Sequence, residues 1–141
     1  MSRREGTVGR PSYCFGKRLE LPFAEAVART NAALAAAGLG AVAEIDLQAL
    51  LERRLGQQVP PYRILVACHP QLAGHALAAE PAVGVLLPSN VVVRQLAASA
   101  GAGVQVDLVS PNAVLGLAQR PEVASVAAEL RALLEQVLVS L

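Results

Sequence analysis

A cysteine and a histidine stand side by side where the sequence passes from a strand pattern to a helix pattern. Cys68 ends a predicted strand that starts at Tyr62 and has an apolar centre from Ile64 to Ala67. Pro70, directly after His69, suits the first position of a helix because it has no amide hydrogen. Ligands gather beyond the carboxyl ends of strands in α/β layouts, and a helix N-terminus favours a thiolate. Cys68 is therefore a candidate nucleophile with His69 as its base, and all of Cys68, His69 and Pro70 are candidate ligand-binding residues.

The alternative interpretation of this pair is structural. Cysteine is one of the most commonly buried residue types, and no second cysteine follows in the Cys-x-x-Cys arrangement of a redox pair. No metal site is predicted, because His69 and His75 are six residues apart, which is about 600° around a helix. The residues point to no particular cofactor.

A second turn that could hold chemistry is formed by Pro88, Ser89 and Asn90, between two apolar segments. A nucleophilic serine needs a base and an oxyanion hole, and no Gly-x-Ser-x-Gly element surrounds Ser89. We interpret this segment as a turn whose side chains cap its own backbone. Gly101 and Gly103 do not form a phosphate cradle, because no Lys-Ser/Thr follows them and a strand pattern comes next.

The elements that must position these turns begin with two strands, predicted at residues 13–19 and 41–45. Each strand is followed by a helix, predicted at 22–37 and 47–55. Gly38 is expected to end the first helix in a left-handed conformation, and Gly56 to end the second. The Asp46 carboxylate can accept a hydrogen bond from the free amides at the start of the second helix, and Ser110 is expected to cap a later, brief helix in the same way.

In the second half, strands are predicted at residues 62–68, 83–87, 90–96 and 104–109. A short helix is predicted at 70–79 and a long helix at 121–141, and a brief helical piece begins at 110. The strand at 62–68 has a continuous apolar centre, of the type that is buried on both faces. The last helix has a wide apolar stripe at the i, i+3, i+4, i+7 spacing, and the pattern leaves open whether this stripe faces the chain's own sheet or a second subunit.

Composition predicts one folded domain. The chain has 141 residues, 54% of them hydrophobic and 16% charged, which excludes a disordered chain. We expect a flexible basic leader at residues 1–12 and a single α+β domain at 13–141.

Residues 1–18 hold five basic and one acidic side chain, whereas 19–141 hold seven basic and ten acidic, so no nucleic-acid partner is expected. No segment has the length and apolarity of a membrane span, and no secretory signal is visible. A cytoplasmic location with reduced cysteines at 14 and 68 is the expectation.

Several stretches of the chain resemble the domain of unknown function 302 family. The matching residues are Tyr62-Arg63-Ile64-Leu65-Val66-Ala67-Cys68-His69-Pro70, Ala73, Ala76-Leu77, Glu80-Pro81, Gly84, Leu86-Leu87-Pro88-Ser89-Asn90-Val91-Val92-Val93, Gly38-Leu39-Gly40 and Glu44-Ile45-Asp46. The similarity runs from about Phe23 to the C-terminus. It implies a small α+β domain with a mixed sheet, with helices packed on that sheet and with the element order β-α-β-α-β-α-β-β-β-α-α. Such domains tend to form homodimers, and the resemblance implies no established reaction.

The chain departs from the family pattern at three places. His69 stands where the family usually has Asn, Ser89 where it usually has Cys, and Ser110-Pro111 where it usually has Asp-Pro. Any chemistry in relatives that requires two thiols is therefore in doubt here.

Three hypotheses about function follow. The first is a non-catalytic homodimeric domain that binds a small ligand beside the two turns, at Cys68, His69, Pro70, Pro88, Ser89 and Asn90. The second is a thiol-dependent enzyme or redox sensor that uses Cys68 with His69. The third is a structural interaction module whose last helix offers Leu134, Val137, Leu138 and Leu141 to another protein.

Overall fold

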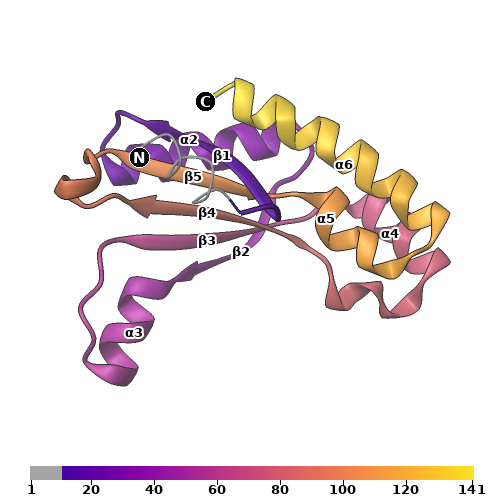
Figure 1. Cartoon of the computed structure of the whole chain (residues 1–141), viewed down its shortest axis with the longest axis horizontal. Coiled ribbons are helices and arrows are strands. Elements are labelled where there is room, and N and C mark those ends of the chain that lie inside the picture. Colours follow the sequence, from indigo (N-terminus) through magenta and orange to yellow (C-terminus); the bar gives the residue numbers. More distant parts are fainter. Residues whose placement is uncertain (1–10) are drawn as a thin grey trace.

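The computed structural model describes residues 11–141, so that most of the predicted basic leader lies outside the described residues. Its five strands are β1 (Cys14–Leu19), β2 (Ala41–Asp46), β3 (Tyr62–Ala67), β4 (Ser89–Gln95) and β5 (Val104–Val109). They form one sheet in the order β1-β5-β4-β3-β2 (Figure 1). The predicted α+β class is confirmed. The predicted mixed sheet is wrong, since all four strand pairings are antiparallel.

The helices are α2 (Phe23–Ala36), α3 (Leu47–Leu55), α4 (Pro70–Ala79), α5 (Pro111–Leu115) and α6 (Pro121–Val139), with 3₁₀ turns η1 (Pro81–Val85), η2 (Ala98–Ala100) and η3 (Gly116–Ala118). The strand predicted at 83–87 is therefore wrong, because most of that apolar run belongs to η1. The apolar run is short because Pro81 and Pro88 flank it and Gly84 interrupts it. A short apolar segment has a similar composition in a strand and in a buried turn, so composition does not distinguish the two. None of the helices in residues 11–141 is long and apolar enough to cross a bilayer.

Local rules set most helix ends. Gly38 and Gly56 adopt positive φ values of 79° and 66°, as expected for residues that follow a helix. The Asp46 carboxylate accepts a hydrogen bond of 3.0 Å from the amide of Ala49, which confirms the predicted cap of α3. The predicted cap at Ser110 is wrong, because its hydroxyl accepts instead from Arg131 of α6, at 3.4 Å.

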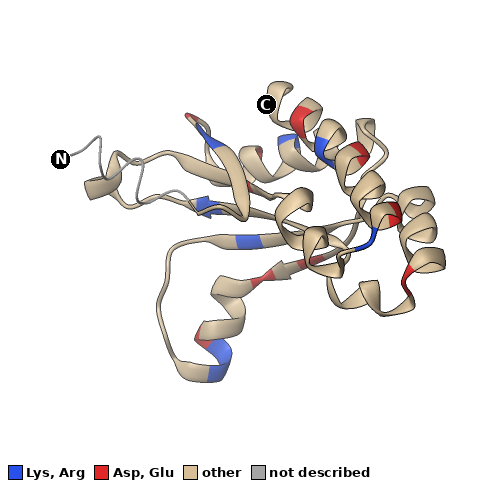
Figure 2. Cartoon of the chain, turned by 45° about the vertical axis from the view of Figure 1, so that its right-hand side comes forward, with Lys and Arg blue, Asp and Glu red and all other residues tan. Residues whose placement is uncertain are grey.

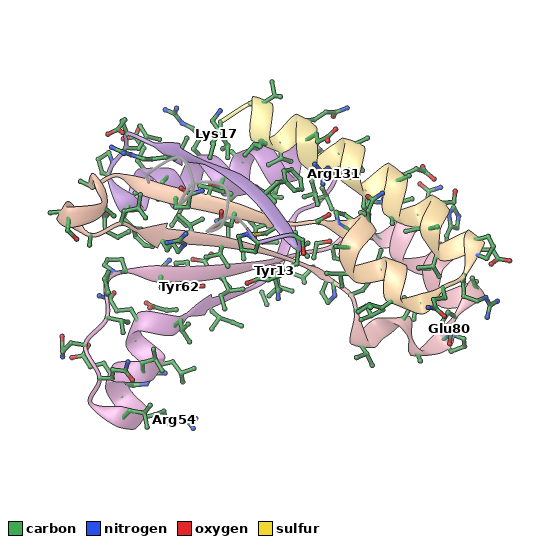
Figure 3. All side chains as sticks on the ribbon, viewed as in Figure 1. Tyr13, Lys17, Arg54, Tyr62, Glu80 and Arg131 are labelled. Atoms are coloured by element: carbon green, nitrogen blue, oxygen red, sulfur yellow. The ribbon has the colours of Figure 1, made fainter. Side chains whose placement is uncertain are left out.

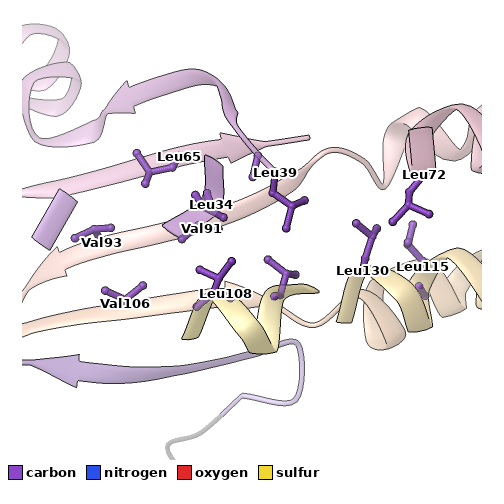
Figure 4. Close-up of a cluster of buried hydrophobic side chains, with 14 of the residues drawn as sticks. Leu34, Leu39, Leu65, Leu72, Val91, Val93, Val106, Leu108, Leu115 and Leu130 are labelled. Atoms are coloured by element: carbon purple, nitrogen blue, oxygen red, sulfur yellow. The ribbon is translucent and has the colours of Figure 1, made fainter. Parts of the chain in front are cut away.

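The core lies on one face of the sheet, where strand residues such as Leu65, Val91 and Leu108 are fully buried against the helices (Figure 4). The opposite face has a different character. Four aliphatic side chains there are exposed or half-buried, and we call this set the open face: Ile45, Ile64, Val66 and Val92. The prediction that the strand at 62–68 is buried on both faces is therefore wrong, because the described helices cover only one of them.

Helix α6 packs on its own chain. Leu134 is fully buried and Val137 is 1% exposed, so neither offers a surface to another protein, and the third hypothesis is wrong on this point. Leu138 and Leu141 are half-buried against the same core. At its end the helix is tied to β1, because the Lys17 ammonium donates to the Leu138 carbonyl at 3.2 Å. Figure 3 shows Lys17 and Arg131 on this side of the molecule.

Helix α3 projects from the β2 edge of the sheet, apart from the other helices (Figure 1). It has no buried residue, and every residue of β2 is exposed. Basic and acidic residues are scattered over the ribbon, with the basic residues of α3 near its free end (Figure 2). At the opposite end of the sheet, α4, α5 and α6 gather together, and this end holds both predicted functional turns.

Candidate functional site

The sheet register brings the two predicted turns together. Ala67, the last residue of β3, lies opposite Ser89, the first residue of β4. The chain leaves β3 through Cys68, passes through α4 and η1, and returns to β4 through Pro88. The two turns are therefore spatial neighbours, as the hypothesis of a ligand bound beside both of them requires. The reason is the antiparallel pairing of β3 with β4, which makes the end of one strand the start of the other.

A pocket of about 200 Å³ lies where the turns meet. We call it the turn pocket. Its lining residues come from the end of β3, from α4, from η1 and the turn before β4, and from α6: Ala67, Cys68, His69, Ala73, Leu77, Gly84, Leu87, Pro88, Ser89 and Leu130. No Asp, Glu, Lys or Arg occurs in this lining, so the surface of the turn pocket is apolar apart from a thiol, an imidazole and a hydroxyl.

Cys68 contributes a half-buried free thiol to the turn pocket. Its amide donates to the carbonyl of Gly40, 3.4 Å away, just before β2 begins. This bond holds the turn beyond the last register pair of β3. The backbone of Cys68 is therefore held in place at the pocket wall, where the residue is half-buried.

His69 caps helix α4 with its side chain. Its Nδ1 accepts a hydrogen bond of 3.2 Å from the amide of Leu72, and its backbone is extended as expected at a cap position. Because Nδ1 uses its lone pair in this bond, the proton of the neutral ring is assigned to Nε2. The edge of the ring packs on Gly38, where an added Cβ would lie 3.3 Å from the ring Cδ2. In this arrangement His69 offers a donor and holds the helix, and it has no unshared lone pair for a base.

The start of α4 has little capacity for an anion. Pro70 has no amide hydrogen, Leu72 donates to the His69 ring, and Ala73 donates to the His69 carbonyl at 2.9 Å. The cap and the first helical bond therefore use most of the amides at this helix end. A charged ligand would gain few hydrogen bonds there.

Ser89 is the most enclosed polar residue of the turn pocket, with only 5% of its surface exposed. Its side chain makes no hydrogen bond with any residue in 11–141, so the prediction that it caps its own turn is wrong. No side-chain nitrogen or oxygen that is sealed from solvent lacks a partner in this part of the chain. The Ser89 hydroxyl is therefore not sealed, and the space it opens to is the turn pocket.

Not all of the predicted site residues line the turn pocket. Cys68, His69, Pro88 and Ser89 do, whereas Pro70 and Asn90 are exposed and lie outside the lining. Asn90 falls on the other side of β4, because alternate residues of a strand point to opposite faces. His75 is exposed on α4, and residues 11–141 hold no group of three or more His, Cys, Asp or Glu that could bind a metal ion.

Sequence reasoning missed the apolar wall of the turn pocket. Ala73, Leu77, Gly84 and Leu87 lie in the stretches that carry the family resemblance, so they could have been included with the turns. Leu130 had no such signal, because it belongs to the regular apolar stripe of α6 and reaches the turn pocket only through tertiary packing.

Comparison with known proteins agrees with the sequence resemblance. The model of the family described as Domain of unknown function DUF302 matches residues 15–141. The crystal structure of an uncharacterized conserved protein, DUF302, from Bacillus stearothermophilus is similar to this chain with a TM-score of 0.83 and 22% sequence identity. The similarity covers 92% of this chain and 98% of that chain, and at this identity it supports the fold alone. No match was found among curated proteins.

Proposed function

Because the chain belongs to the family of domains of unknown function DUF302, we propose a function from its own geometry. The protein is a homodimeric domain that binds a small molecule in the turn pocket and catalyses no reaction. The observation that carries the proposal is the turn pocket itself, in which two turns far apart in sequence meet. A reducing, cytoplasmic location is part of the same proposal, and the free thiol of Cys68 supports it.

The dimensions and lining of the turn pocket support ligand binding. Binding sites are concave and mostly apolar, with a few polar groups that orient the ligand. The turn pocket has this character, and its volume of about 200 Å³ is that of a small ligand. An engineered apolar cavity of about 150 Å³ in another protein binds benzene, so the turn pocket has room for one ring with a substituent.

The hydrogen bonding of His69 argues against a thiol-dependent enzyme. A general base must accept a proton from the nucleophile, but Nδ1 of His69 is already bound to the Leu72 amide. The ring would have to give up the helix cap before it could serve Cys68. The lining also offers no carboxylate that could take the role of the base. These features favour binding over the alternative of a Cys68–His69 enzyme or redox sensor.

The open face supports the homodimer. The apolar centre of β3 has the composition of a strand covered on both sides, yet Ile64 and Val66 are only half-buried. Ile45 of the neighbouring β2 pairs with Ile64 and is 40% exposed. Nearby charges do not oppose contact there, because Arg94 and Asp107 pair with each other at 3.3 Å. A second copy of this chain would cover the same aliphatic surface on both partners.

Sedimentation at micromolar concentration tests the homodimer. We expect the unchanged protein to sediment as a dimer and Ile45→Asp to sediment as a monomer, since the charge would be buried at the interface. Val139→Asp is the matched control, because Val139 is an 83% exposed aliphatic residue on α6, away from the open face. A monomeric unchanged protein would contradict the dimer, and a dimeric Ile45→Asp would contradict the surface.

Binding of toluene tests the turn pocket. We expect toluene to shift the amide NMR signals of the lining residues, and Ala73→Leu to abolish these shifts by filling the space. Ala78→Leu adds the same side chain on an exposed position of α4 outside the lining, and it should leave binding intact. Equal effects of the two leucines, or no shifts in the unchanged protein, would refute the assignment of the turn pocket as a binding site.

A further inference from the structure

We propose that the ligand of the turn pocket is an uncharged molecule with the size of a single ring and one hydrogen-bonding group that pairs with the Ser89 hydroxyl. This inference rests on the proposed function, because it names the chemical class that the same site accepts. Three observations lead to it: the charge of the lining, the state of the helix end beside it, and the unpaired hydroxyl of Ser89.

The lining excludes charged ligands. It contains no Asp, Glu, Lys or Arg, so a carboxylate, phosphate or ammonium group would enter an apolar space without a counter-charge. Transfer of an ion into such surroundings is far more costly than transfer of a neutral polar group. The start of α4 compensates little, because Pro70 has no amide hydrogen and the amides of Leu72 and Ala73 are already bonded to His69, which leaves only the amide of Gln71.

Ser89 supplies the polar contact. The residue is 5% exposed, lines the turn pocket, and its side chain is without a hydrogen-bond partner among residues 11–141. Because this hydroxyl is open to the turn pocket and no residue in 11–141 pairs with it, a ligand atom at that point would form a hydrogen bond with it. Since a hydroxyl both donates and accepts, it suits an alcohol, a carbonyl or an amide. The strand position makes the contact rigid, because the backbone of Ser89 is paired with Ala67.

Size follows from the volume. About 200 Å³ accommodates a ring with a small substituent, and the aliphatic walls formed by Leu77, Leu87 and Leu130 give the ring its contacts. The class is therefore a neutral, ring-sized molecule with a single polar atom at its inner end.

Two pairs of isosteric probes test this inference by NMR titration of the full chain. Phenol and toluene differ by a hydroxyl in place of a methyl group, and benzamide and benzoate differ mainly by charge. We expect Ser89→Ala to weaken phenol binding by about three- to tenfold, the effect of one lost hydrogen bond, and to leave toluene binding unchanged. We expect benzoate to bind at least about tenfold more weakly than benzamide.

The outcomes separate this inference from the function on which it rests. If Ser89→Ala weakens phenol and toluene equally, or weakens neither, the hydroxyl does not receive the polar group and the inference is overturned. Benzoate binding as tightly as benzamide also overturns it, and in both cases the turn pocket remains a binding site as long as Ala73→Leu blocks binding. If no probe binds, or Ala73→Leu does not block binding, the inference and the proposed function both fail.

Discussion

Arg131 is the side chain on α6 whose loss should most clearly loosen that helix from the sheet. Its guanidinium lies 3.9 Å from the centre of the Phe15 ring on β1, and its Nη1 donates to the Ser110 hydroxyl at 3.4 Å. It also pairs with Glu135, one helical turn further along, at 2.9 Å. The side chain is 35% exposed, so solvent weakens the ion pair. We predict that Arg131→Ala destabilises the protein through the ring contact and the hydrogen bond.

The magnitude follows from the separate contacts. An exposed cation–π contact contributes about 0.5–1 kcal/mol, and a long hydrogen bond about 0.5 kcal/mol. The ion pair adds about 0.3–0.5 kcal/mol, as is usual for pairs spaced by four residues. The expected loss in free energy of unfolding is therefore about 1.3–2 kcal/mol. With a urea dependence of about 1–3 kcal/mol per M, the unfolding midpoint should fall by about 0.4–2 M.

Arg29→Ala is the matched control for this change. Arg29 pairs with Glu25 at the same four-residue spacing, at 3.4 Å, and is 47% exposed, but within residues 11–141 its guanidinium contacts no aromatic ring. Both variants gain the same helix propensity, so urea unfolding followed by circular dichroism at equal protein concentration isolates the Phe15 and Ser110 contacts. We expect Arg29→Ala to lose at most about 0.5 kcal/mol. If the two midpoints fall equally, the ring contact does not have the role assigned to it.

Two further changes test the ends of α3 by the same urea unfolding. Asp46→Ala should cost about 1 kcal/mol because it removes the cap on the Ala49 amide, whereas Asp46→Asn keeps an acceptor and should cost less; equal losses would argue against the cap. Gly56→Ala should cost about 1 kcal/mol because φ there is 66°, whereas Gly40→Ala meets open space and should be neutral or slightly stabilising; a neutral Gly56→Ala would show that the backbone relaxes.

Helix ends were predictable from sequence because each is decided by one or two neighbouring residues. Gly38, Asp46 and Gly56 are such cases, and the structure agrees with all three. The direction of strand pairing was not predictable in this way. A strand, a helix and another strand follow one another from Tyr62 to Gln95, which is also the order of a parallel crossover unit. Here the helix lies beyond the end of the sheet, and β4 returns antiparallel to β3.

The candidate site was predictable in part for the same physical reason. Cys68 and Ser89 were found because the residues at strand ends belong to recognisable motifs. The hydrogen-bond partner of each side chain was not predictable from the sequence. The sequence does not show that the His69 ring is taken up by the Leu72 amide, or that Ser110 accepts from a helix that follows later in the chain. Both depend on distances that only the folded chain defines.

The pairing of β1 with β5 sets an order of assembly. Leu19 lies opposite Val104, so β1, which is synthesised before the other four strands, gains its backbone partner only when nearly the whole sheet has been synthesised. Closing the long loop between β1 and β5 costs conformational entropy, and no contact between residues close in sequence offsets this cost. The strands β2, β3 and β4, which are neighbours in both sequence and space, can join much earlier. Nascent chains released before Val109 would therefore keep an unmatched strand at their amino end, exposed to proteases and to other unfinished chains.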